Sequence, residues 1–168
     1  MTETFTWDAL ARDDYFIDYQ NIYTNLGVMS VRNLFLTCAD VFVRAGENDR
    51  ALEMVDKCFE VTAPYPLETI PLGFSDMHVI FLLEHYYNLG QAEKARQIAT
   101  RLGAELLQTA RFYIEFFSYA KSDFETVQKT IYNLAYVLKA GGDDELATQL
   151  VDNLSTLIDV ANEALGES

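Results

Sequence analysis

Apolar residues recur at a helical spacing in the stretch that begins near residue 30. From Ser30 to Ala45 they fall at i, i+3, i+4, i+7 and i+8, which places them on one face of an α-helix. These positions are Val31, Leu34, Phe35, Cys38, Ala39, Phe42 and Val43. A second helix is expected after Gly46, with Asn48 as its N-cap. Its apolar face comprises Ala51, Leu52, Val55, Cys58 and Phe59.

A proline-containing loop separates these helices from the next two. All three prolines lie within residues 63–74, and proline is not tolerated in a helix interior. Ser75 is expected to cap a third helix that ends at Leu89, where Gly90 stops it. A fourth helix is expected from about residue 92 to residue 118, and Gly103 is a position where that helix could bend.

Two further helices complete the pattern. Ser122 and Glu125 have the spacing of a capping box, which predicts the start of a fifth helix that continues to about residue 140. Adjacent glycines at positions 141 and 142 then interrupt it. Asp143 or Asp144 is expected to cap a sixth helix that reaches about residue 165, because a helix N-terminus favours negative charge.

The turns between paired helices repeat one arrangement. An alanine follows each turn glycine by five residues, and a large apolar or aromatic residue precedes it by four. The sets are Phe42, Gly46 and Ala51; Tyr86, Gly90 and Ala95; and Leu138, Gly142 and Ala147. Glycine suits a left-handed turn, and alanine lets two helices cross closely. This order resembles the tetratricopeptide repeat (TPR), although the glycines are 90 − 46 = 44 and 142 − 90 = 52 residues apart and a TPR unit has about 34.

The predicted fold class is therefore all-α, a right-handed stack of about three antiparallel helix hairpins with degenerate, TPR-like repeats. A single helical domain is expected over residues 30–166. Residues 1–29 show weak periodicity but several aromatic residues. We expect them to form a lead-in that packs on the first hairpin.

A narrower resemblance rests on the order and spacing of residues over roughly residues 5–160. Its positions are Phe5, Trp7, Ile17, Asp18, Arg32, Asn33, Phe35, Ala39, Gly46, Ala51, Val55, Asp56, Lys57, Cys58, Pro64, Pro71, Tyr86, Tyr87, Gly90, Ala95 and Tyr113. Together they resemble the C-terminal soluble region of a polytopic membrane-protein family that is abundant in Bacteroidetes. That family is of unknown function and is related to the GT-C type protein O-mannosyltransferases.

This resemblance implies an accessory, TPR-like module of a membrane-embedded, glycosyltransferase-like protein. In that family the catalytic machinery lies in an N-terminal membrane domain, so the resemblance transfers no catalytic residue to the present sequence. It also implies a location on the periplasmic side of the inner membrane. The membrane domain of the parent protein is then a candidate partner.

Charge narrows the classes of partner. The chain has 12 Lys and Arg against 26 Asp and Glu, a formal charge of −14. Such a surface repels nucleic-acid phosphates and anionic lipid headgroups, so we expect neither nucleic-acid binding nor direct membrane insertion. No apolar run reaches the roughly 18–20 residues of a membrane-spanning helix, and the N-terminus lacks a signal-peptide pattern. A free-standing chain is therefore expected to be soluble and cytoplasmic.

The histidines and cysteines do not have the sequence spacing of a catalytic or metal-binding site. His78 and His85 are seven residues apart on one expected helix, a rise of about 10.5 Å that one metal ion cannot bridge. Cys38 and Cys58 do not form a zinc-binding pair and are expected to be buried thiols. We therefore expect no catalytic residue, no metal site and no cofactor, and the chain is predicted not to be an enzyme.

Two groups of residues are candidates for partner binding. Stacked first helices of TPR-like hairpins form a concave groove. Its expected lining residues are Arg32, Asn33, Asp40, His85, Tyr87 and Asn88. Residues 111–119 carry aromatic side chains beyond one helical face, with Phe116 and Tyr119 as candidate contacts. That segment is either a helix buried between hairpins or an exposed patch that docks a partner.

These features favour a non-catalytic protein-interaction or scaffolding module that binds a protein or peptide. The alternative is a helical domain that binds or processes carbohydrate in a cleft of acidic and aromatic residues. A homo-oligomeric structural protein is a third hypothesis, for which the mass of the particle in solution is the discriminating measurement.

Overall fold

Six α-helices make up the described part of the chain, and no strand occurs there. The computed structural model describes Trp7 and residues 27–70 and 77–165. The helices are α2 (Val28–Arg44), α3 (Asn48–Val61), α4 (His78–Asn88), α5 (Ala92–Glu115), α6 (Phe117–Ala140) and α7 (Asp144–Leu165). The predicted all-α class is therefore confirmed.

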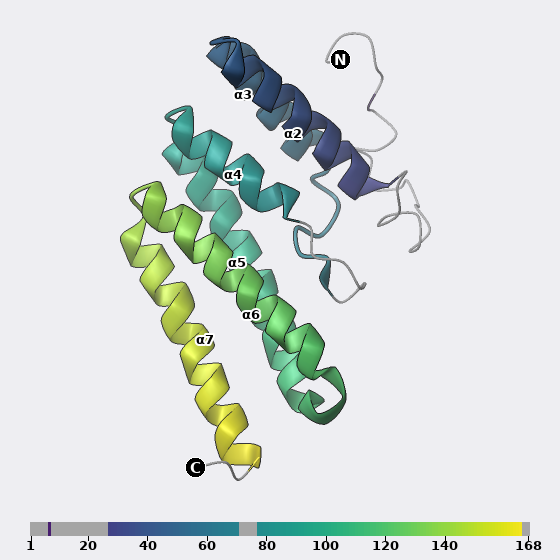
Figure 1. Ribbon diagram of the computed structural model, residues 1–168, viewed down its shortest axis with the longest axis vertical. Helices are drawn as coiled ribbons and strands as arrows, with labels where there is room; N and C mark the ends of the chain where they lie inside the picture. Colours follow the sequence, from purple (N-terminus) through teal and green to yellow (C-terminus); the bar gives the residue numbers. More distant parts are fainter. Residues whose placement is uncertain (1–6, 8–26, 71–76, 166–168) are drawn as a thin grey trace.

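The helices follow one another in three pairs along the long axis of the molecule (Figure 1). The pairs are α2 with α3, α4 with α5, and α6 with α7, and the short turns within the pairs lie on the same side. α4 contacts α2, α3 and α6, while α5 packs against α6 and α7. The middle pair therefore touches both of its neighbours.

The three turns within the pairs share one backbone geometry. Gly46, Gly90 and Gly142 have φ values of 76°, 74° and 86°, in the left-handed region that glycine adopts without strain. In each turn the residue that follows the glycine donates its backbone N–H to the carbonyl of the residue four positions before the glycine. These bonds join Glu47 to Phe42 at 2.9 Å, Gln91 to Tyr86 at 2.8 Å and Asp143 to Leu138 at 2.9 Å. This Schellman geometry satisfies carbonyl groups that would otherwise end each helix without a partner. The left-handed turns predicted at these glycines are confirmed.

The alanine that follows each turn lies in the core. Ala51, Ala95 and Ala147 are fully buried, and each lies one turn into the second helix of its pair. A methyl group is the largest side chain that such a contact accommodates without separating the helices. The surrounding core is aliphatic, and its most buried members include Val55, Leu82, Leu83, Leu106, Ile131, Leu134, Leu138 and Leu154.

The segment between α3 and α4 is attached to α5 and α2. Glu105 of α5 accepts hydrogen bonds from the backbone N–H groups of Leu67 and Glu68, at 2.8 and 2.9 Å. Arg32 of α2 donates to the carbonyl of Pro66 at 2.8 Å. The loop predicted from the prolines is therefore held by charged side chains over its described part.

Most of the predicted lead-in over residues 1–29 lies outside the described residues. Trp7 is described, and its ring lies 5.1 Å from the ring of Phe35 on α2. Ser75, the expected cap of the third helix, also lies outside, and α4 itself begins at His78.

Two expected helix starts are wrong. Asn48 is the first residue of α3 rather than its cap, and Glu47 precedes the helix without a side-chain capping bond. Ser122 is not an N-cap, because α6 begins at Phe117, although non-helical angles at Ala120 divide α6 and its regular part begins one residue before Ser122. The ring of Phe117 packs against that of Phe124 at 5.6 Å, so burial of an aromatic pair favours an earlier start.

The connection between α5 and α6 also differs from the prediction. α5 ends at Glu115, three residues before the expected end, and the only residue between the helices is Phe116, with φ −118° and ψ 25°. Ala120 has similar angles and kinks α6. Gly103 does not end α5; a Cβ added there would lie 3.2 Å from Cδ1 of Leu150, so this glycine permits a close approach of α7.

Ala95→Val should reduce the free energy of unfolding by about 1–3 kcal/mol, because added methyl groups overpack a fully buried contact. Ala92 is exposed in the same helix, so Ala92→Val is the matched control and should change stability by at most about 0.5 kcal/mol. Urea unfolding followed by circular dichroism measures both values. Equal losses in the two variants would contradict close packing at Ala95.

Candidate partner-binding surface

The structure separates the residues that the sequence assigned to one groove. Asn33 and Asn88 are exposed and remain available to a partner. Arg32 is fully buried, and its guanidinium donates to the Pro66 carbonyl, so its role is to hold the loop between α3 and α4. Nε2 of His85 lies 2.8 Å from Oδ1 of Asp40, which links α4 to α2.

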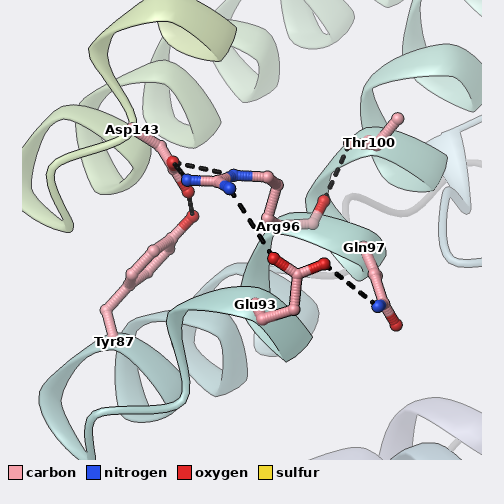
Figure 2. Close-up of polar contacts among 6 residues, drawn as sticks. All are labelled: Tyr87, Glu93, Arg96, Gln97, Thr100 and Asp143. Carbon is pink, nitrogen blue, oxygen red and sulfur yellow. Dashed lines mark hydrogen bonds and ion pairs between the residues drawn. The ribbon is translucent and has the colours of Figure 1, made fainter.

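Tyr87 belongs to a polar cluster at the junction of the second and third helix pairs (Figure 2). Its hydroxyl donates to Oδ2 of Asp143 at 2.5 Å, and Arg96 donates from Nε to Oδ1 of the same carboxylate at 2.9 Å. Nη2 of Arg96 also contacts that oxygen, and Glu93 lies 3.6 Å from Nη1. Tyr87, Glu93, Arg96 and Asp143 are called the Asp143 cluster below.

Asp143 is the buried charged group of the Asp143 cluster. The Asp143 side chain is 6% exposed, whereas Arg96 extends to the surface. Burial alone would raise the pKa of Asp143, but hydrogen bonds from Arg96 and Tyr87 outweigh it and lower that pKa. Burial and the neighbouring carboxylate raise the pKa of the Tyr87 hydroxyl. The ionised carboxylate and neutral phenol are therefore the stable forms at neutral pH.

Tyr87 also packs against the turn before α7. A Cβ added at Gly141 would overlap the Tyr87 ring, so the absence of a side chain at Gly141 lets the ring lie on the backbone there. Asp143 follows this turn directly, and its own carbonyl accepts a hydrogen bond from Ala147 of α7. One tyrosine thus fixes both the turn and the start of the last helix.

A second cluster joins the middle helix pair to the first pair. The Tyr86 hydroxyl donates to Oδ1 of Asp56 at 2.8 Å, and Nζ of Lys94 lies 2.8 Å from both oxygens of that carboxylate. The Tyr86 ring stacks on Phe59 with a centroid separation of 5.5 Å. Burial, followed by the bond to Asp56, raises the pKa of the Tyr86 hydroxyl. Tyr86, Lys94 and Asp56 are called the Asp56 cluster.

The two clusters position α4 so that aromatic side chains on α4 and α6 face solvent. Phe81 of α4 and Tyr132 of α6 are exposed, and Tyr136 is 74% exposed. Nδ2 of Asn133 lies 3.9 Å from Sδ of Met77, one helical turn before Phe81, which brings the two helices together here. Phe81, Tyr132 and Tyr136 are called the aromatic face.

The aromatic face was not predicted from the sequence. A signal was present, because Tyr132 and Tyr136 are four residues apart and therefore share one side of a helix. Their neighbours Ile131, Leu134 and Ala135 form the buried side of α6. Two tyrosines opposite an aliphatic stripe indicate exposed rings.

The other predicted contacts lie at the connection between α5 and α6. Phe112 and Phe116 are exposed, with ring centroids 5.2 Å apart, and Tyr119 is 93% exposed. Tyr113 is buried in the same segment. Residues 111–119 therefore combine both expected arrangements, a buried anchor and an exposed aromatic tip.

Among the described residues, no group of three or more His, Cys, Asp or Glu side chains is arranged to hold a metal ion. Within the same ranges, no helix combines the length and apolar character needed to cross a bilayer. Comparison with protein-family models, curated proteins and solved structures finds no match.

Asp143→Asn should lower the free energy of unfolding by about 1–2 kcal/mol, because the amide is a weaker acceptor for Arg96 and Tyr87. Asp152→Asn is the matched control, since Asp152 is exposed on α7, and it should change stability by less than about 0.5 kcal/mol. Chemical denaturation at neutral pH distinguishes them. Equal effects of the two substitutions would show that the Asp143 cluster does not stabilise the fold.

The stability advantage of the wild-type chain over Asp143→Asn should also depend on pH. The folded-state pKa of Asp143 is lowered from 3.8, so its stabilisation is complete above that value and is lost as pH falls through the folded-state pKa. Unfolding curves recorded at a series of pH values should therefore converge in acid. A difference that stays constant down to about pH 2 would contradict the lowered pKa.

Proposed function

We propose that this chain is a non-catalytic interaction or scaffolding module built as a TPR-like, right-handed stack of three helix hairpins. The observation that carries the proposal is the aromatic face, which exposes Phe81, Tyr132 and Tyr136 on helices held by the two clusters. Exposed aromatic side chains on a rigid support are common anchors of protein interfaces. A partner protein or peptide is the occupant that such a surface favours.

Three features support the TPR-like arrangement. The turns within the pairs have the same hydrogen bonds, the same left-handed glycine and the same buried alanine five residues later. In repeat proteins of this kind each hairpin contacts its neighbours, and the exposed sides of successive helices form an extended binding surface. α2, α4 and α6 are the first helices of the three pairs, and two of them carry the aromatic face.

The sequence resemblance extends the proposal to a parent protein. We assign the chain as the soluble C-terminal domain of a membrane-embedded, glycosyltransferase-like protein, located on the periplasmic side of the inner membrane. The membrane domain of that parent is the favoured partner. In this role the module positions or recognises another polypeptide while the membrane domain carries the chemistry.

The polytopic membrane protein encoded with or next to this chain in its genome is the partner to test. Purified in detergent, it should bind the immobilised chain, and Tyr132→Ser/Tyr136→Ser should weaken binding at least tenfold, because each exposed aromatic anchor contributes about 1–2 kcal/mol. Biolayer interferometry measures the dissociation constant. Unchanged affinity in the double variant would exclude the aromatic face.

Phe116→Ser/Tyr119→Ser is the matched control, since it removes two exposed aromatic rings at the connection between α5 and α6. It should leave the affinity within about twofold of wild type. If only this control loses affinity, the binding surface lies at the connection between α5 and α6 and not on the aromatic face. Titration with soluble oligosaccharides tests the alternative function, carbohydrate binding. If the wild-type chain binds a sugar saturably and Tyr132→Ser/Tyr136→Ser does not, the domain is a carbohydrate-binding domain and the interaction-module proposal is wrong.

A further inference from the structure

A hollow of about 170 Å³ lies between α5 and α7, with Leu138 of α6 in its lining, and it shares no residue with the aromatic face. Its lining is mainly apolar and consists of Ala99, Thr100, Gly103, Ala104, Leu107, Leu138, Leu146, Gln149, Leu150 and Asn153. Thr100 and Ala104 are exposed, so the hollow opens to solvent. An apolar cavity of roughly 150 Å³ holds a benzene ring. The hollow therefore has room for one leucine or phenylalanine side chain.

Small residues on α5 create this space. Ala99, Gly103 and Ala104 follow one another along the wall of the hollow, where larger side chains would fill it. The Thr100 hydroxyl donates to the carbonyl of Arg96 at 2.8 Å, which satisfies its polar group within the helix. The α5 side of the hollow is therefore suited to an apolar group rather than to a hydrogen-bonding ligand.

α7, which forms the other side of the hollow, is an anionic helix. α7 contains no Lys, Arg or His, and its acidic residues are Asp144, Glu145, Asp152, Asp159 and Glu163. Asp144, Glu145 and Asp152 line an open surface with Thr148, Gln149 and Asn153. Gln149 and Asn153 also line the hollow, so the acidic surface and the apolar hollow are continuous.

Two basic residues of α5 beside the hollow already have carboxylate partners. Arg96 is bound to Asp143 and lies near Glu93. Arg101 pairs with Glu105 at 2.9 Å and donates to a backbone carbonyl in the loop after α3. Among the described residues, the open surface that adjoins the hollow is lined by three carboxylates and by no basic residue, which favours a cationic partner.

We propose that the groove between α5 and α7 docks an amphipathic, cationic helix of a partner protein. One leucine or phenylalanine of that helix occupies the hollow, and lysine or arginine residues on its flank lie along the acidic side of α7. Helix-in-groove recognition uses this division, in which apolar anchors supply affinity and complementary charge supplies orientation and association rate. This surface is separate from the aromatic face, so the two proposals can fail independently.

The probe is a synthetic helix of about 18 residues, long enough to be helical in isolation, with leucine on one face and lysine on the other. It should bind the full chain saturably in fluorescence anisotropy, and its affinity should fall with salt. A scrambled peptide of the same composition and a leucine–glutamate helix should each bind at least tenfold more weakly. Equal binding of the scrambled peptide would reduce the interaction to non-specific charge attraction and overturn the proposal.

Two variants locate the site. Ala104→Phe fills the hollow from an exposed position and should weaken peptide binding at least tenfold, while Ala92→Phe, at an exposed alanine that does not line the hollow, should not. Glu145→Gln/Asp152→Asn should weaken binding several-fold and reduce its salt dependence. Circular dichroism confirms that each variant is folded.

The remaining outcomes separate this site from the other proposals. Tyr132→Ser/Tyr136→Ser should bind the peptide with wild-type affinity, and a loss there would place the peptide on the aromatic face instead. Unchanged binding in Ala104→Phe would overturn the groove as the site. If sedimentation shows that the chain dimerises and Ala104→Phe makes it monomeric, the occupant is a second copy of this chain and the cationic-helix proposal is wrong.

Discussion

An aspartate on each side of the middle helix pair determines where that pair lies. Asp56 accepts from Tyr86 of α4 and Lys94 of α5, and Asp143 receives the same two kinds of donor from Tyr87 and Arg96. Phenol and cation together satisfy each carboxylate, which makes partial burial of the charge tolerable. α4 is the shortest of the described helices and relies on these contacts as well as on its aliphatic core.

This arrangement separates two kinds of surface. α4 and α6 expose aromatic rings, whereas α5 and α7 form an apolar hollow beside an acidic helix. Both surfaces lie on the second and third helix pairs, which the Asp143 cluster joins. The two surfaces are therefore held in a fixed relation to one another, as a scaffold that contacts more than one polypeptide requires.

Local signals in the sequence predicted the turns well and the helix starts less well. Gly90 and Ala95 determine the turn through contacts within a few residues, so their roles follow from spacing alone. Ser122 has the correct spacing for a cap but lies inside α6, two residues after the kink at Ala120. The rings of Phe117 and Phe124 pack together across this kink, and a capping pattern at two positions does not predict that packing.

The same limit applies to the candidate site. Arg32 is a charged residue of the kind expected in a binding groove. Its partner is instead a carbonyl 34 residues away, in a loop whose path cannot be predicted from the sequence. Tyr87 was expected to face a partner and instead bonds to Asp143, 56 residues away. The tyrosines of α6 were accessible to prediction through their four-residue spacing, since that spacing depends only on helix geometry.

The adjacency of Tyr86 and Tyr87 has a mechanical consequence. Stacked helical repeats usually interact only with their nearest neighbours, so the ends of such a protein can unravel separately. Here two consecutive residues of one short helix bond to two different neighbouring pairs, Tyr86 to Asp56 and Tyr87 to Asp143. A rotation of α4 by a fraction of a turn would break both attachments at once. A displacement of α3 at Asp56 is therefore coupled through α4 to the turn at Asp143, in addition to the packing between the helix pairs.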